Sequence, residues 1–181
     1  MFTGLVEEVG TIASIVERGG NHRITINAPA TAKELQQGNS VAVSGVCLTA
    51  LDITPQSFCA DLAAETWRLT SLSRITQGAL VNLELPLKAD GRMGGHMVQG
   101  HVDGTGRFVG LEPIANADDF WLLLDIPEEL EVCCVQGLNR HRRNQPHGGK
   151  AGRSAAYHCH HPAHREDDKS RFAEARRSGE H

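Results

Sequence analysis

Short runs in which apolar and polar residues alternate fill most of the first 130 positions. Ser40–Val43 and Leu80–Leu87 have the two-residue period of a strand with one buried face. Other runs are rich in β-branched residues and end near glycine or proline: Leu5–Val16, Val46–Ile53 and Ser57–Leu62. Because turn residues separate these short runs, the pattern predicts an all-β fold, a small antiparallel barrel or sandwich.

Two helical segments and a faint repeat add to this pattern. Ala30–Leu35 and Ala63–Leu69 favour short helices. Three positions recur at a constant offset: Gly4 with Gly100, Val6 with Val102, and Gly10 with Gly106. The repeat indicates that a first barrel occupies residues 1–97 and that a second, similar barrel starts at residue 98 and continues to residue 136.

The composition changes abruptly after Gln136. Residues 137–181 contain one Leu and neither Val nor Ile, and they hold 10 Lys and Arg against 5 Asp and Glu. Residues 1–136 hold 8 Lys and Arg against 17 Asp and Glu, so the sign of the net charge reverses at this point. A segment so poor in apolar residues cannot offset the entropy lost on ordering, and we expect residues 137–181 to form a disordered tail.

Charge and cysteine content narrow the possible functions. The net charge of −4 gives no reason to expect nucleic acid or a membrane surface as a partner. No apolar run approaches the roughly 20 residues that cross a bilayer, and no signal peptide opens the sequence. The five cysteines lack a disulfide spacing: Cys47, Cys59, Cys133, Cys134 and Cys159. These features predict a cytoplasmic protein with reduced thiols.

Four stretches carry a family resemblance. They are Met1–Gly10, Ser40–Thr49, Glu65–Leu72 and Gly94–Gly104. Each is modestly specific alone, whereas their order and spacing together are highly specific. Taken together they resemble riboflavin synthase of the bacterial type, a family built on lumazine-binding barrels, and the likeness extends to about residue 136.

The resemblance implies two six-stranded antiparallel Greek-key barrels in one chain, followed by a C-terminal helix that gathers three chains into a homotrimer. It implies a dismutation of two 6,7-dimethyl-8-ribityllumazine molecules, in which one donates a four-carbon unit to the other. The products are riboflavin and 5-amino-6-(ribitylamino)uracil, and neither a metal nor a redox cofactor takes part. The alternatives are a non-catalytic lumazine- or flavin-binding protein on the same barrel, and a stable single-barrel fragment.

Four residues are candidates for the chemistry of this reaction. The resemblance places the Cys47 thiol at the ring of the bound lumazine, although a free cysteine is more often a small buried side chain. It also assigns His101 to the ligand site, where an imidazole suits proton transfer near neutral pH. His96 and His101 are five residues apart, and an odd separation places two side chains on opposite faces of a regular strand unless Gly100 introduces a bulge. The alternative is that the two are a pair of surface histidines. Ser40, at a strand start, either bonds the ligand or a water, or caps a turn.

Contacts to the substrate are expected in several places. The resemblance suggests that Gly4–Val6 presents a strand edge to the uracil-like face of the ring, and that Asp61–Thr66 meets the ribityl hydroxyls. Alternatively, Asp61 caps a helix and Glu65 stabilises its dipole. The expected substrate-binding residues are Phe2, Gly4, Leu5, Val6, Cys47, Leu48, Thr49, Asp61, Leu62, Ala63, Ala64, Glu65, Thr66, Gly100, His101 and Val102.

A shift of reading frame accounts for the abrupt end of the likeness. With permitted third codon bases, Gln136–Ala151 read one base later becomes KGSIAIDGISLTVAKL, which resembles the chain's own Gly38–Leu51. The same shift converts His158–Glu180 into a string with counterparts of Ala64–Thr70 and Gln77–Asn82. Three barrel motifs recovered in order indicate a frameshift, by mutation or sequencing error, after about residue 136. A genuine basic, disordered tail is the alternative.

The tail also contains a cluster of imidazole and thiol side chains within Tyr157–His164 that would suit Zn²⁺. If the tail is read out of frame, this spacing is accidental, and we therefore expect no metal site. Gln136 stands where the resemblance favours a lysine near the ligand, and it lies at the proposed break.

Overall fold

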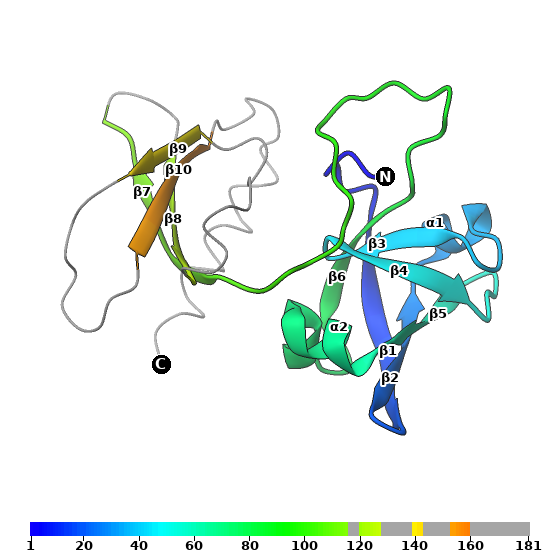
Figure 1. Ribbon diagram of the computed structural model, residues 1–181. Coiled ribbons are helices and arrows are strands. Elements are labelled where there is room, and N and C mark those ends of the chain that lie inside the picture. The colour runs from blue at the N-terminus through cyan, green and yellow to red at the C-terminus, as the bar shows by residue number, and fades with distance from the viewer. Residues whose placement is uncertain (116–119, 128–138, 143–152, 160–181) are drawn as a thin grey trace.

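Figure 1 shows the computed structural model, which describes residues 1–115, 120–127, 139–142 and 153–159. Strands dominate these residues and form two sheets. The first sheet is made of β1 (Glu8–Arg18), β2 (Asn21–Asn27), β3 (Ser40–Val43), β4 (Val46–Leu51), β5 (Ser57–Leu62) and β6 (Leu80–Glu84). Three helices lie in its connections: α1 (Pro29–Glu34) between β2 and β3, and α2 (Ala64–Leu69) and the 3-10 helix η1 (Ser71–Arg74) between β5 and β6. The second contains β7 (Arg107–Pro113), β8 (Phe120–Ile126), β9 (Asn139–Arg142) and β10 (Arg153–Cys159).

The first sheet closes into a six-stranded barrel in the order β1-β2-β5-β4-β3-β6, and all of its pairs are antiparallel. β3, β4 and β5 follow one another as a meander, and β6 returns to pair with β3. A strand that returns beside the first member of a meander defines a Greek key. The prediction of an all-β fold with a six-stranded antiparallel Greek-key barrel is therefore confirmed.

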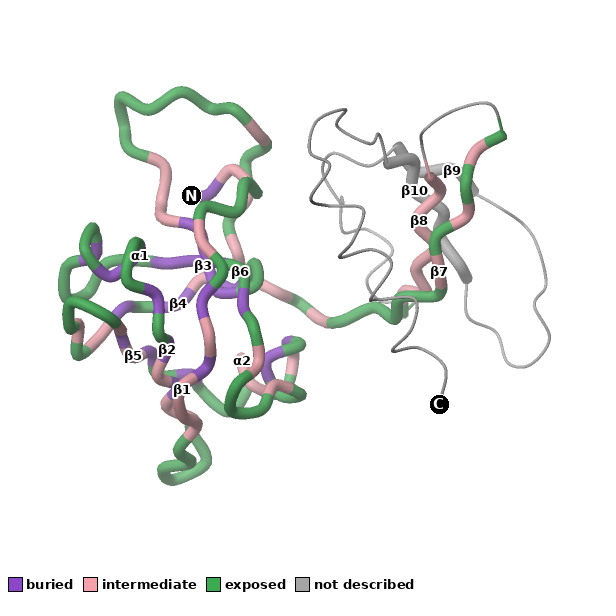
Figure 2. Tube along the Cα trace, turned by 180° about the vertical axis from the view of Figure 1, so that it is seen from behind, coloured by how far each residue is buried: buried purple, intermediate pink, exposed green. Residues whose placement is uncertain are grey.

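The hydrophobic core lies inside this barrel, where the buried positions gather in Figure 2. In β4, Val46, Leu48 and Ala50 are buried, whereas the side chains of Cys47 and Thr49 between them are not. Alternate residues thus fill the interior, as the pleat of a strand requires. Within the described residues, every buried position falls between residues 2 and 84, and none belongs to β7 or β8.

Most predicted elements are present, with shifted ends. β3 and β5 have the predicted bounds. Both predicted helices are present, and each of their ends lies within one residue of the expected position. β1 begins at Glu8 rather than Leu5, since the chain turns at Gly4, whose φ is +81°. The sequence pattern does not predict β2, because its apolar residues are only Ile24 and Ile26.

Both helices receive hydrogen bonds from neighbouring strands rather than from their own N-cap side chains. Glu8 of β1 accepts from the backbone N–H groups of Ala30 and Thr31, at 3.1 and 2.6 Å, where α1 begins. Asn21 of β2 accepts from the N–H of Ala64, at 3.2 Å, where α2 begins. These bonds satisfy N–H groups that lack partners inside a helix, and they tie each helix to the barrel wall.

The N-terminal segment covers one end of the barrel and encloses a carboxylate. Phe2 is 1% exposed and forms an antiparallel bridge with Val98, with N–H to O distances of 2.7 and 3.0 Å. Thr3 donates its backbone N–H and its hydroxyl to Glu84, and the N–H of Gly4 donates to the same carboxylate at 3.0 Å. The sequence alternation turns Glu84 away from the core, but these donors cover it and leave it 7% exposed.

The second sheet has the order β7-β8-β10-β9. β9 and β10 fall within residues 137–181, where the sequence predicts disorder; β10 pairs with β8 on one side and with β9 on the other. The other residues of that segment and Gln136 lie outside the described residues, as does most of the Tyr157–His164 cluster. In the described part of the chain, no three metal-ligating side chains gather, and no helix is long and apolar enough to cross a membrane.

Candidate functional site

The barrel wall has an open seam between β4 and β5, and we refer to it below as the seam. Both strands extend over six residues, but their ladder consists of only two pairs, Ala50 with Ala60 and Leu51 with Cys59. Beyond these pairs, Cys47–Thr49 and Asp61–Ala63 are not paired with each other. Two strand edges therefore face one another without the hydrogen bonds that close the rest of the barrel.

The backbone groups of Thr49 point into the seam. Ala50 bonds toward β3, because its N–H donates to Asn39 and its C=O accepts from Gly38. Cys47 bonds on the opposite side, where its N–H donates to the carbonyl of Gly100 at 2.9 Å. Since backbone groups alternate in direction along an antiparallel strand, Thr49 faces the same side as Cys47.

The predicted site residues of β3, β4 and β5 do not all face the seam. Leu48 and Leu62 are 5% and 1% exposed inside the core, and the backbone of Leu48 faces β3, on the same side as that of Ala50. Cys47 is half-buried, and Thr49 is exposed opposite Ser40, its cross-strand partner. Cys47 and Thr49 therefore bring a thiol and a hydroxyl to the β4 edge of the seam, whereas Ser40 lies on β3, on the other side of β4.

The segment after β6 brings His101 to this region. Gly100 accepts the hydrogen bond from Cys47, so its neighbour His101, whose side chain is exposed, follows directly. Val102 packs against the core and fixes the other flank of His101. His96 lies elsewhere, because its backbone N–H donates to Thr3 at 2.8 Å. The two histidines do not lie on a regular strand, so the argument from opposite strand faces does not apply to them.

The N-terminal candidates form a separate group. Phe2 is buried and bridges to Val98, while Leu5 and Val6 are 53% and 54% exposed. The N–H of Gly4 is bonded to Glu84 and that of Leu5 to the Thr3 hydroxyl at 3.3 Å, so these two groups are engaged within the protein. The connection from this group to the seam is indirect and runs through residues 98–100.

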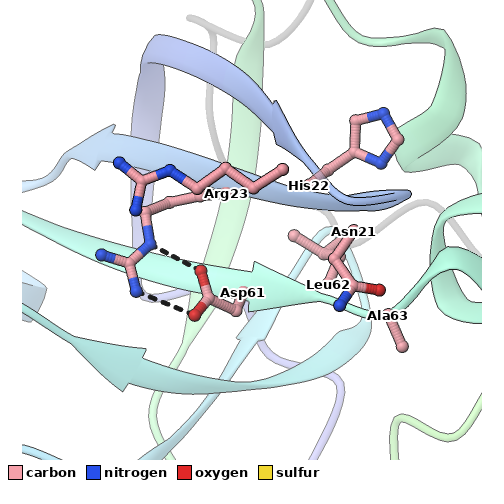
Figure 3. Close-up of a pocket in the computed structure, with 7 residues that line it drawn as sticks. Asn21, His22, Arg23, Asp61, Leu62 and Ala63 are labelled. Atoms are coloured by element: carbon pink, nitrogen blue, oxygen red, sulfur yellow. Dashed lines mark hydrogen bonds and ion pairs between the residues drawn. The ribbon is translucent and has the colours of Figure 1, made fainter.

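Asp61 is held by an arginine of the neighbouring strand. Arg23 Nε and Nη2 donate to the two carboxylate oxygens of Asp61 at 2.6 and 2.8 Å, as Figure 3 shows, and Nη1 donates to Asp52 at 2.7 Å. The hydrogen bonds from Arg23 hold the pKa of Asp61 below its usual range. The alternative that Asp61 caps α2 is wrong, because Ala63 is the N-cap residue and the capping oxygen is supplied by Asn21.

The remaining candidates lie at the start of α2. Ala63, Ala64 and Glu65 are exposed and Thr66 is half-buried. A hollow of about 230 Å³ borders this region, lined by Arg18, Asn21, His22, Arg23, Asp61, Leu62 and Ala63. Sequence reasoning missed the β2 residues of this lining, because only the pairing of β2 with the distant β5 brings Arg23 opposite Asp61.

Comparison with known proteins identifies the class of this barrel. Residues 3–86 match the lumazine binding domain family. Solved structures of LumP support the same fold. The complex with 6,7-dimethyl-8-(1'-D-ribityl) lumazine aligns with a TM-score of 0.62 at 22% identity over 71% of each chain. The complex with riboflavin aligns with a TM-score of 0.62 at 23% identity, over 72% of this chain and 70% of that one.

The relatives by sequence are riboflavin synthases. The chain is 43% identical over 125 residues to riboflavin synthase of Bacillus subtilis, covering 69% of this chain and 58% of the relative. It is 44% identical over 117 residues to that of Actinobacillus pleuropneumoniae, covering 65% and 54%. The resemblance predicted from the four motifs is thus confirmed. The chain aligns with little more than half the length of these relatives.

Proposed function

We propose that the seam binds the ring of a lumazine or flavin and that the ribityl chain of this ligand extends toward Asp61 and the start of α2. The observation that carries this proposal is the interruption of the β4–β5 ladder at Cys47–Thr49 and Asp61–Ala63. A flat heterocycle with alternating donors and acceptors can bond to a free strand edge much as a peptide does. The exposed side chains around α2 supply partners for several hydroxyls.

For the full-length protein we propose the riboflavin synthase reaction, in which two 6,7-dimethyl-8-ribityllumazine molecules yield riboflavin and 5-amino-6-(ribitylamino)uracil. The N–H of Cys47 donates to Gly100, the neighbour of His101, and Cys47 and His101 are the candidates to act at the ring. The imidazole of His101 would take the proton from the acidic methyl group of the donor. Ser40 would bond the ligand or a water beside Thr49, whereas His96, Phe2 and Gly4–Val6 belong to the separate N-terminal group.

We further propose that residues 1–97 form the first barrel, that residues 98–136 begin a second, and that residues 137–181 are translated out of frame. The protein in its intact frame would be a cytoplasmic homotrimer, with each active site between the first barrel of one subunit and the second barrel of a neighbour. Sequencing the gene across the codons for Val135–Leu138 tests the frame directly. A stop codon in the shifted frame before the end of a second barrel would contradict it.

For the chain as it stands, we expect binding without turnover. The seam is complete, but β7 and β8 contain no buried residue on which a second ligand site could be built. Holding two reactants in a productive orientation supplies roughly 7–11 kcal/mol toward a reaction barrier, and this chain would hold one.

Fluorescence titration with riboflavin, followed by a lumazine turnover assay on the same purified protein, tests this expectation. Saturable binding with no enzymatic production of riboflavin supports it. Riboflavin formation at the rate of a frame-restored protein would contradict the expectation that this chain lacks the second ligand site. Absence of binding would contradict the assignment of the seam.

A further inference from the structure

Three consecutive residues at the start of β2 each hold a different part of the segment 61–67. The contacts are the hydrogen bond from the Ala64 N–H to Asn21 Oδ1, the stacking of the His22 ring on Trp67, and the bonds from Arg23 to Asp61. The stacked rings lie 3.9 Å apart, with 4° between their planes. One short stretch of β2 therefore fixes the end of β5 and the first turn of α2 together.

The bond between Arg23 and Asp61 is suited to orientation. The guanidinium is planar, and two of its nitrogens bond the two carboxylate oxygens in parallel, which fixes the plane of the carboxylate. The third nitrogen is bonded to Asp52 and prevents the fork from rotating. Arg23 and Asp61 side chains are 26% and 50% exposed, and ion pairs that face water contribute little to the free energy of unfolding.

The held carboxylate still has acceptor capacity. Each of its oxygens has two lone pairs, and the guanidinium occupies one on each, so two directions remain for hydroxyl donors. Asp61 also lies directly next to the unpaired edge of the seam. A polyhydroxy chain that leaves the seam would meet an acceptor already fixed in place.

We propose that Asn21, His22 and Arg23 are positioning residues that select ligands with a ribityl chain, and that Arg23 is the main determinant because it orients Asp61. The proposal rests on the proposed function of the seam. It assigns no contact with the ring to β2. It therefore separates recognition of the ring, at Cys47–Thr49, from recognition of the chain, at segment 61–67.

The test compares two ligands on the full chain: riboflavin, and lumiflavin, which has the same isoalloxazine ring with a methyl group in place of the ribityl chain. Arg23→Met retains the length of the side chain and removes the fork. We expect its affinity for riboflavin to fall about tenfold while its affinity for lumiflavin is unchanged. Arg23→Lys should behave in the same way, since an ammonium group cannot form the parallel pair of bonds.

Arg74→Met is the matched control, because Arg74 is exposed in η1, does not line the hollow and has no hydrogen bond to Asp61. It removes the same charge and should change neither affinity. Equal loss of both ligands in Arg23→Met, or unchanged riboflavin affinity, would overturn the proposal. If that variant does not fold, Asp61→Asn gives the same comparison with the shape retained. A wild-type chain that binds neither ligand would instead refute the proposed function itself.

Discussion

Gly100 is the residue through which the segment after β6 contacts β4. Its φ is +79°, and a Cβ placed on it would lie 2.9 Å from both the Cβ and the N of Cys47. A side chain at this position would therefore be strained by its backbone conformation and would also displace Cys47. The hydrogen bond that brings the backbone next to His101 onto β4 depends on this close approach.

We expect Gly100→Ala to lower riboflavin affinity in a binding titration, beyond its effect on stability. The left-handed conformation alone should lower the free energy of unfolding by roughly 1–2 kcal/mol. Gly78→Ala is the control, since Gly78 has φ +87° with no atom within 4 Å of the added Cβ. That control should lose stability but retain affinity. Equal affinities in the two variants would show that the contact of Gly100 with Cys47 is dispensable.

Glu84 gives a second prediction at this scale. Glu84→Ala removes the acceptor of three hydrogen bonds and leaves the N–H groups of Thr3 and Gly4 without it. Thr3 is half-buried and Gly4 is exposed, so water can replace part of the lost acceptor, and we expect urea unfolding to show a loss of about 1–2 kcal/mol. Glu17→Ala, at an exposed position of β1, should change stability by less than about 0.5 kcal/mol. Similar losses in both variants would refute a structural role for Glu84.

At the scale of elements, the two helices are held by strands that precede them in the chain. α1 and α2 have six residues each, too few to be stable alone. Their N-terminal N–H groups are bonded to Glu8 and Asn21 on β1 and β2. The orientation of α2, with Glu65 and Thr66, is therefore set by the barrel and not by helix propensity.

The cap on α1 should depend on pH. Burial raises the pKa of Glu8, but the hydrogen bonds from Thr31 and Ala30 lower it by a larger amount. The pKa of Glu8 in the fold therefore lies below its ordinary value. A carboxylate with a lowered pKa stabilises the fold fully above its unfolded pKa and loses this effect as the pH falls through the folded value. We expect Glu8→Gln to be about 1 kcal/mol less stable near neutral pH and to approach the wild type in strong acid. A constant difference across that range, measured by thermal unfolding, would contradict this.

Strand alternation alone predicts a small antiparallel barrel or sandwich, and the family resemblance is what selects the six-stranded barrel. Ser40–Val43 and Ser57–Leu62 have a clear period of two, and their bounds agree with β3 and β5. The same alternation places Glu84 on the outward face of its strand, which predicts an exposed side chain. The structure differs because Thr3 and Gly4 return to cover this carboxylate, and no local sequence pattern shows that return. The contact of Arg23 with Asp61 was missed for a similar reason: residues 38 positions apart meet only after β2 and β5 pair.

At the scale of the whole molecule, the described strands of the second sheet contain no fully buried position, and β8 is half-buried along its length. Every buried position among the described residues lies at or before residue 84, and Val102 is the last residue that packs on this core. In the second sheet, Phe108, Val109 and Leu111 are 60%, 45% and 37% exposed. Folding of the barrel should therefore not require the second sheet.

We expect a chain ending at residue 106 to fold and to bind riboflavin with the affinity of the full chain. The fragment keeps every buried position found in the described part of the chain, as well as Gly100 and His101. Its melting temperature and its titration curve should match those of the full chain. An unfolded fragment would mean that residues beyond 106 contribute to the barrel in a way that its contacts do not show.

The seam also affects how the protein behaves at high concentration. Closing a sheet into a barrel removes strand edges, which would otherwise pair with other molecules, but the split between β4 and β5 restores two short ones. A ligand bound there would occupy the same backbone groups that a strand from another molecule would use. Riboflavin would then act as a small-molecule chaperone, and its presence during expression or refolding should raise the yield of monomer by protecting these edges rather than by altering the core.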